Sequence, residues 1–375
     1  MRYDIGLSKY GCMRYLALPW AQTVRRAAVD GFTPDGAITS GFENVITEKV
    51  MHVLLDITTE KRPKEEWAGC RAIILEVARS AAMHGAWQHS GRQIFELAPK
   101  LVAAFRLTDV THSSFEGLHL PYRAFFLHFG LQRDLVFQRN RLFPTTNVDG
   151  AYVVRDADGS VVIELTLFDC DTPARSEPGP TVLITPELAT LGAEDAIDRA
   201  IDREVGWLRN REPVNLDSIS LLENARILDE ARPALRAAAT LISNALFYLS
   251  EPHDDVTTTV EEGAPQALVD RAQHGAGNRQ RKARQSLSAE GYAVVRYCGR
   301  RFSLPGTEGD GTGDPRATHW RRGHWRNQRC GPRLSQIKRL WIKPVLVGAE
   351  HGEPERGRVY LVGEHAGTES AGRAA

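Results

Sequence analysis

The 375-residue sequence has few cysteines, no long hydrophobic run and no net charge. Its five cysteines are scattered without Cys-x-x-Cys spacing, which argues against a disulfide framework and favours a reducing compartment. No stretch approaches the ~20 apolar residues that a membrane-spanning helix needs. The N-terminal residues also lack the apolar segment and cleavage site of a secretion signal, so we expect a cytoplasmic protein.

Familiar catalytic motifs are missing as well. The sequence contains no Gly-x-Ser-x-Gly, no His-Glu-x-x-His, no P-loop, and no Gly-x-Gly-x-x-Gly between a strand and a helix. The Gly-rich segment 306–313 lacks a Lys-Ser/Thr pair and carries acidic residues, so it predicts a flexible loop rather than a phosphate-binding loop. We therefore expect no cofactor, and a binding protein more readily than an enzyme.

The zero net charge conceals a strong asymmetry along the chain. Residues 1–270 carry 27 Lys and Arg against 38 Asp and Glu, whereas residues 271–345 carry 17 against 4. A basic block beside an acidic body indicates either an anionic partner or two parts of the chain that neutralise each other. The count leaves both readings open.

The basic block is densest between residues 315 and 347, where a His-Trp-Arg unit occurs twice. Arginine holds phosphate through two bonds, and flat rings stack on bases, so this composition favours binding of a nucleic-acid strand or another anionic partner. Alternatively, the two indoles are core anchors and the arginines a solvated rim. The predicted partner-binding residues are His319, Trp320, Arg321, Arg322, His324, Trp325, Arg326, Arg329 and Arg333.

Metal ligands are available but poorly arranged. His319, His324 and Cys330 lie among arginines that repel a cation, and no second cysteine is near, whereas structural zinc prefers a closed ligand set. Asp169 and Asp171 are more typical of residues that close a turn. The sequence therefore predicts no metal site.

A ribonuclease is the main enzymatic alternative. His324 could act as a general base with Arg322 as a transition-state clamp, because the histidine pKa lies near working pH. The acidic cluster of Glu251, His253 and Asp254 is a second candidate site, although a helix stop followed by solvated acids also explains it.

One run of residues carries a family resemblance. It comprises Arg321-Arg322-Gly323-His324-Trp325, followed by Gly331, Trp341, Pro344 and Val347. This pattern resembles the C-terminal signature of the second family of type V-A anti-CRISPR proteins, which phages and plasmids carry. Weaker similarities occur upstream, at His84-Gly85-Ala86-Trp87, Leu120-Pro121 and Tyr248-Leu249-Ser250-Glu251-Pro252.

The resemblance implies suppression of CRISPR immunity through a lower level of the effector nuclease. In that family the loss is linked to translation, because the nascent effector is recognised and its mRNA is degraded. The implied partners are the nascent effector polypeptide, its mRNA or the ribosome.

Periodicity predicts an α+β fold, with helices packed on a mixed or antiparallel sheet, because long helical patterns stand beside grouped strands. His84 ends a buried helical stripe before Gly85, which favours a capping or core histidine over a catalytic one. The expected helices span 63–84, 98–106, 191–210, 215–231, 233–250 and 264–272. The expected strands span 122–129, 150–155, 161–169 and 181–185, with a hairpin turn at Asp156-Ala157-Asp158-Gly159.

The C-terminal part of the chain is expected to contain a mobile basic linker at 275–284. Strands 292–302 and 337–347 are expected to pair, so that the His-Trp-Arg repeat becomes a loop between them. The predicted segments are a weakly patterned N-terminal segment 1–62, an acidic α+β body 63–272, a basic C-terminal region 273–347 and a disordered tail 348–375.

Overall fold

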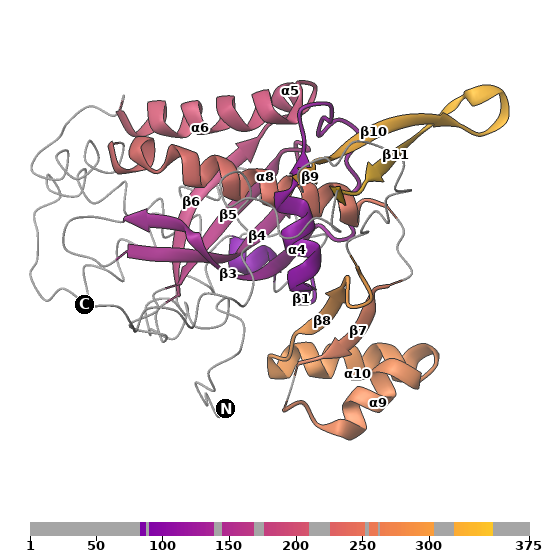
Figure 1. The fold of residues 1–375 in the computed structure, drawn as a ribbon. Helices are drawn as coiled ribbons and strands as arrows, with labels where there is room; N and C mark the ends of the chain where they lie inside the picture. Colours follow the sequence, from indigo (N-terminus) through magenta and orange to yellow (C-terminus); the bar gives the residue numbers. More distant parts are fainter. Residues whose placement is uncertain are drawn as a thin grey trace, which may run out of the picture.

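The computed structural model is organised around one large sheet, and it describes residues 83–87, 90–138, 145–168, 176–209, 226–251, 255–261, 263–303 and 319–347. The strands of this sheet are β1 Gln93–Leu97, β3 Ala124–Gln138, β4 Thr145–Arg155, β5 Val161–Phe168, β6 Ser176–Ile184, β7 Thr257–Val260 and β8 Val294–Cys298. Their order is β6-β5-β4-β3-β1-β8-β7 (Figure 1). Strands β3 to β6 form an antiparallel meander, whereas β1 is parallel to both of its neighbours. The sheet is therefore mixed, and the predicted α+β class is confirmed.

The meander contains the predicted hairpin turn between β4 and β5. The backbone N–H of Asp156 donates to the Ser160 carbonyl (2.8 Å), and the Asp158 carboxylate accepts the Ser160 N–H (2.8 Å). Gly159 has a φ of +90°, a conformation that glycine adopts without strain. The turn prediction is confirmed, and its carboxylates serve the turn.

Helices cover one face of the sheet. They include α4 Pro99–Arg106, α5 Pro186–Ala189, α6 Ala193–Arg209 and α8 Arg232–Leu249. Figure 1 shows α6 and α8 running side by side across this face. The predicted apolar stripe of α8 is buried in the main core, as the exposures of Leu235 (0%) and Ile242 (0%) show.

Alternation along β3 sends neighbouring side chains into two cores. Phe125 and Leu127 enter the core beneath α8, while Phe126 points to the other face, toward Trp87 and Tyr152. His84 lies in this second core with 4% exposure, and its ring centroid is 5.2 Å from that of Trp87. The prediction of a core histidine is confirmed.

The expected mobile linker at 275–284 is wrong. The structure has a helical hairpin there, formed by α9 Gln266–His274 and α10 Gly277–Glu290 (Figure 1). Ala283 and Leu287 of α10 pack on Ala272 of α9 in a small core of their own. Among the residues of α10 whose burial is described, Ala283 and Leu287 are the buried ones, so the sequence of this helix shows almost no hydrophobic periodicity.

The expected pairing of the two C-terminal strands is also wrong. β8 lies between β1 and β7, so its two edges are occupied. The His-Trp-Arg repeat is not a loop: it forms β9 His319–Arg321 and the start of β10 Gly323–Cys330. β10 pairs antiparallel with β11 Gln336–Ile342, and β9 pairs with β12 Val345–Val347. A local hairpin therefore replaces the long-range pairing, because it needs a much shorter loop.

Several predictions lie outside the described residues. They concern segments 1–62, 306–313 and 348–375, the Asp169/Asp171 pair, and most of the helices expected at 63–84 and 215–231. In the part of the chain that is described, no helix is both long and apolar enough to cross a membrane.

Candidate partner-binding hairpin

The C-terminal hairpin, defined here as residues 323–342, is the most prominent projection of the described structure. It consists of β10, a short 3-10 turn η3 (Pro332–Leu334) and β11, and it extends from the body in yellow in Figure 1. At its base, β10 also pairs in parallel with the two-residue strand β2 Thr108–Asp109. One end is thus tied to the body while the other reaches into solvent.

Trp325 fixes the base of the hairpin in the main core. Its side chain is 3% exposed and packs edge-to-face on Phe247 of α8, with ring centroids 5.8 Å apart. The indole N–H donates to the Asn244 side-chain oxygen (2.6 Å), while the Asn244 amide donates to the carbonyls of Phe105 and Thr108 (both 3.0 Å). Asn244 is 0% exposed, so it connects α8, α4 and the hairpin within the core.

Trp341 completes this anchor from the opposite strand. Its ring stacks on Trp325 (5.8 Å, 18°), its register partner, and on Phe302 (5.5 Å, 13°). The Trp341 indole N–H donates to the Thr108 hydroxyl (3.1 Å), which itself donates to the Ala104 carbonyl (2.8 Å). The polar atoms of both indoles are therefore satisfied inside the protein.

Gly323, the first residue of β10, fits only because it lacks a side chain. A Cβ there would lie 2.7 Å from the Thr108 hydroxyl, 2.8 Å from Pro344 Cδ and 2.9 Å from the Ile342 carbonyl oxygen. Real Cβ atoms do not approach so closely, and Thr108 is held by its own hydrogen bonds.

We therefore expect Gly323→Ala to lower the free energy of unfolding by about 1–3 kcal/mol, as overpacking does. Urea unfolding followed by circular dichroism measures this change. Gly159→Ala is an unsuitable control because of its positive φ, whereas Gly206→Ala, with open space around its Cβ, is expected to lose nothing. Equal stability of the two variants would contradict the tight packing at Gly323.

Beyond the anchor, the hairpin is basic and exposed. Arg326, Arg329, Arg333 and Lys338 are all exposed, and no acidic residue occurs between positions 319 and 347. Arg326 donates to the neutral side chain of Gln328 (2.7 Å), and none of the four cations forms an ion pair with any described residue. The charge of the hairpin is therefore not neutralised within the described chain.

The body shows the opposite arrangement. Several of its arginines form ion pairs with nearby carboxylates, for example Arg236 with Asp198 (3.1 Å) and Arg232 with Asp202 (2.7 Å). The described ion pairs all join residues of the body. No described ion pair joins the hairpin to the body, so ion pairing does not support the interpretation that the basic region neutralises the acidic body.

Arg339 is the exception among the hairpin cations. Its guanidinium lies 4.5 Å from the Phe247 ring centroid and donates to the Ser114 carbonyl (2.9 Å). Burial lowers the pKa of Arg339, and the charge of Glu251 partly opposes this shift. Arg339 therefore belongs to the anchor.

The predicted binding residues differ in their exposure to solvent. His319, Arg321, Arg322, Arg326, Arg329 and Arg333 are exposed, while Trp320 and His324 are half-buried. The expectation that both indoles of the repeat face outward is wrong for Trp325, because Phe247 and Asn244 enclose it. Trp320 lies in β9 opposite Leu346, and its indole nitrogen is buried without a described acceptor.

The tip of the hairpin adds a feature that the sequence patterns do not indicate. Leu334 (58% exposed) and Ile337 (67% exposed) are two large hydrophobic side chains in solvent. Arg333 and Leu334 both have left-handed backbone conformations (φ 54° and 57°), which L-residues rarely adopt. Cations and apolar groups are thus presented together at the tip of the hairpin.

The residues of the ribonuclease alternative are only partly assembled. His324 is the register partner of Asp109, and Arg322 lies close enough to influence that carboxylate. Burial raises the pKa of Asp109, but hydrogen bonds from Thr111 and the charges of Arg322 and His112 outweigh it, so the pKa lies below its ordinary value. Asp109 is therefore held as an anion that accepts hydrogen bonds from Thr111, at the β2 position in register with His324.

The other proposed acidic site cannot be placed, because residues 252–254 lie outside the described part of the chain. No group of three or more potential metal ligands occurs among the described residues.

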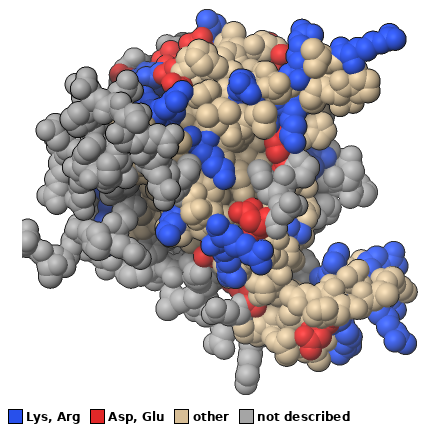
Figure 2. All heavy atoms as spheres, turned by 45° about the vertical axis from the view of Figure 1, so that its right-hand side comes forward, with Lys and Arg blue, Asp and Glu red and all other residues tan. Residues whose placement is uncertain are grey.

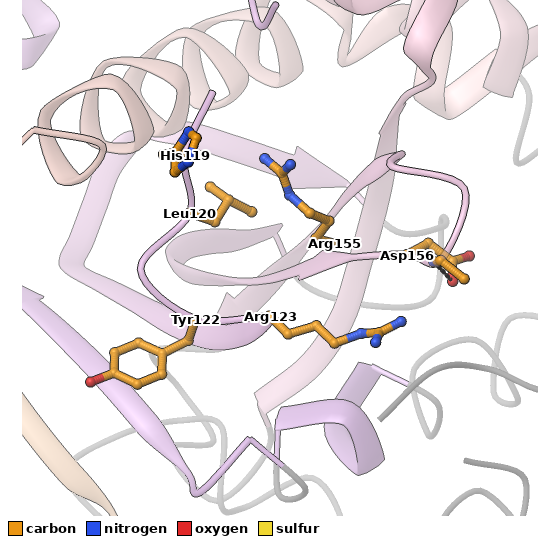
Figure 3. A pocket seen from close by; sticks show the side chains of 7 residues that line it. His119, Leu120, Tyr122, Arg123, Arg155 and Asp156 are labelled. Atoms are coloured by element: carbon orange, nitrogen blue, oxygen red, sulfur yellow. Dashed lines mark hydrogen bonds between the residues drawn. The ribbon is translucent and has the colours of Figure 1, made fainter. Parts of the chain in front are cut away.

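A shallow pocket of about 410 Å³ lies elsewhere, beside the β4–β5 turn (Figure 3). Figure 3 shows Arg155 extending on the side of His119, while Arg123 extends toward Asp156. Arg155 donates to the Leu118 carbonyl, and its buried Nε has no acceptor among the described residues. Arg155 therefore ties the loop before β3 to the end of β4, a structural role.

Asn244 and Thr108 are the site residues that sequence reasoning misses. Asn244 stands inside an otherwise apolar helical stripe, which is the one signal for it, because a buried amide needs specific partners. Thr108 leaves no signal at all.

A protein family and a solved structure are similar to this chain. A solved structure described as "Crystal structure of AcrVA2" is similar over 88% of this chain and 100% of that chain, with 14% identity and a TM-score of 0.37. No curated protein matches the chain. Residues 95–349, which include the whole C-terminal hairpin, match the family described as "AcrVA2-like: Anti-CRISPR type V subtype A2 family". Since this match covers more than half of the sequence, the chain belongs to the AcrVA2-like family of type V-A anti-CRISPR proteins.

Proposed function

We propose that this anti-CRISPR protein suppresses a type V-A effector nuclease during translation, by binding the nascent effector chain or its message and so lowering the effector mRNA. The observation that carries the proposal is the C-terminal hairpin, whose base is fixed in the core and whose exposed cations form no ion pair with a described residue. The place of action is then the cytoplasm of the bacterial host.

The hairpin suits such a partner in two ways. Its acid-free surface attracts the phosphates of mRNA and ribosomal RNA, which are dense in anions. Its tip presents Leu334 and Ile337, which can contact apolar side chains of an unfolded nascent chain. A translating ribosome offers both kinds of contact at once, which favours it over free RNA or folded effector.

The link to translation is tested by comparing two effector messages in cells. One is translated normally, and the other differs only by removal of its start codon. The proposal expects the protein to deplete the translated message and to spare the untranslated one, because only the first carries ribosomes and nascent chain. Equal depletion of both messages would show that translation is not required, and depletion of neither would remove the proposal.

A ribonuclease that acts directly is the second candidate, since Asp109 is the register partner of His324 at the hairpin base and Arg322 influences the Asp109 carboxylate. An ionised carboxylate beside a histidine can orient it as a general base. Cleavage of naked RNA by the purified protein, lost in His324→Gln, would favour this candidate. Intact RNA after prolonged incubation would show that the protein does not cleave RNA itself, so that host nucleases would have to degrade the message.

A further inference from the structure

The α9–α10 helical hairpin carries a second basic surface, distant in the sequence from the C-terminal hairpin. Arg279, Arg281, Lys282 and Arg284 of α10 are exposed, together with Arg271 at the end of α9. No acidic residue occurs between positions 271 and 289. Figure 2 shows Lys and Arg side chains gathered on the lower lobe, where α9 and α10 lie in Figure 1, and again at the upper right.

Among the described residues, the cations of this surface form hydrogen bonds with neutral groups. Arg281 donates to the Asn278 side chain (2.9 Å), Arg284 to the Ala272 carbonyl (3.2 Å) and Arg271 to the Ala267 carbonyl (2.9 Å). None of these arginines forms an ion pair within the described chain. Their positive charge is therefore available to a partner.

The charge is also unfavourable for the helix that bears it. Arg279, Arg281 and Lys282 lie within the first two turns of α10, and its first turn has no acidic residue. Cations near the N-terminal end of a helix oppose its dipole. These cations do not stabilise α10 through its dipole and form no ion pair with a described residue, which favours contact with an external anion.

The chemistry of the surface favours RNA over protein. No large hydrophobic side chain of α9 or α10 is among the exposed ones of the described residues. Protein interfaces need a buried apolar centre, whereas a nucleic-acid backbone is bound by charge alone. Arginine also predominates over lysine here, as suits phosphate.

We infer that the α9–α10 helical hairpin is a second RNA-binding surface, which contacts the phosphate backbone without reading its sequence. The inference rests on the proposed function, since it assigns RNA as one partner of the same protein. Because both basic projections lie on one side of the molecule (Figure 1), a single RNA strand that reaches both gains affinity from their linkage.

The test uses the full-length protein and a single-stranded oligouridine of about 30 nucleotides, long enough to span several contacts. The variant carries Arg279→Gln, Arg281→Gln and Lys282→Gln. These changes remove unfavourable charge and leave the Ala272, Ala283 and Leu287 packing intact, so circular dichroism is expected to show an unchanged fold. The matched control carries Lys100→Gln, Arg133→Gln and Arg199→Gln, three exposed cations of the body.

Fluorescence anisotropy is expected to show about 100-fold weaker binding for the α10 variant at about 0.1 M salt, and a slope of log affinity against log salt shallower by about 2. The control is expected to bind like the wild type. An unchanged affinity and slope in the α10 variant, or no binding by the wild type at low salt, would overturn the inference. Binding of polyglutamate as tightly as RNA would also overturn it, by assigning the surface to acidic proteins.

This outcome is separable from that of the proposed function. The RNA measurement uses purified protein, whereas the proposed function is read from effector mRNA in cells. Normal RNA binding by the α10 variant beside translation-dependent mRNA loss would reject only the inference. RNA binding that depends on α10 without any mRNA loss would reject only the proposed function.

Discussion

Replacing Trp325 by alanine is expected to lower the free energy of unfolding by about 3–5 kcal/mol. The side chain is 3% exposed and fills the space between Phe247 and Trp341. Its loss leaves a cavity at the junction of the hairpin with α8. It also leaves the Asn244 side-chain oxygen buried without its donor (2.6 Å in the wild type).

Urea unfolding of two further variants separates these contributions. Trp325→Phe keeps most of the ring but removes the donor, so a smaller loss of about 1–3 kcal/mol is expected. Ile337→Ala, at a position 67% exposed on the same hairpin, is expected to change stability by less than about 0.5 kcal/mol. If Trp325→Ala were as mild as Ile337→Ala, the hairpin base would not be part of the core.

Neutralising the hairpin is expected to weaken binding to ribosomes that translate the effector by about 100-fold or more. The variant replaces four exposed residues with glutamine, Arg326, Arg329, Arg333 and Lys338. Each phosphate contact that is lost returns counterions to the nucleic acid and lowers the binding constant by a factor. The factors for several lost contacts multiply. Fold is retained, because none of the four residues contacts the Trp325 anchor through a described ion pair or ring contact.

Co-sedimentation at several salt concentrations measures this binding. The control variant replaces Lys100, Arg133, Arg199 and Arg203, four exposed body cations, and is expected to sediment like the wild type. Equal loss in both variants would mean that net charge matters and the hairpin does not. Unchanged binding by both variants would show that these positive charges do not contribute to ribosome binding.

Elements with a strong internal period are predictable from the sequence. Helix 233–250 and strand 161–169 are observed as α8 Arg232–Leu249 and β5 Val161–Phe168. Their buried faces repeat every 3.6 or 2 residues, so the signal is local. α10 has no such signal, because its sequence is almost entirely polar and its few apolar side chains pack in a small core with α9 and neighbouring residues.

Pairing and placement depend on residues far apart in the sequence. Trp325 stands among arginines, and its local context alone suggests an exposed ring. Its hydrogen-bond partner Asn244 is 81 residues away, and Phe247 belongs to the same helix. The composition of residues 319–347 predicts a basic surface, but only the packing shows that the indole at 325 anchors this surface and the arginines form it.

The most direct test of the account is the amount of effector mRNA in cells that express the effector with the wild-type protein, the hairpin variant or the body control. The account predicts low effector mRNA with the wild type and the body control. With the hairpin variant, it predicts the level found in cells that lack the anti-CRISPR protein. Strong depletion of the message by a folded hairpin variant would contradict the central claim that this hairpin binds the partner.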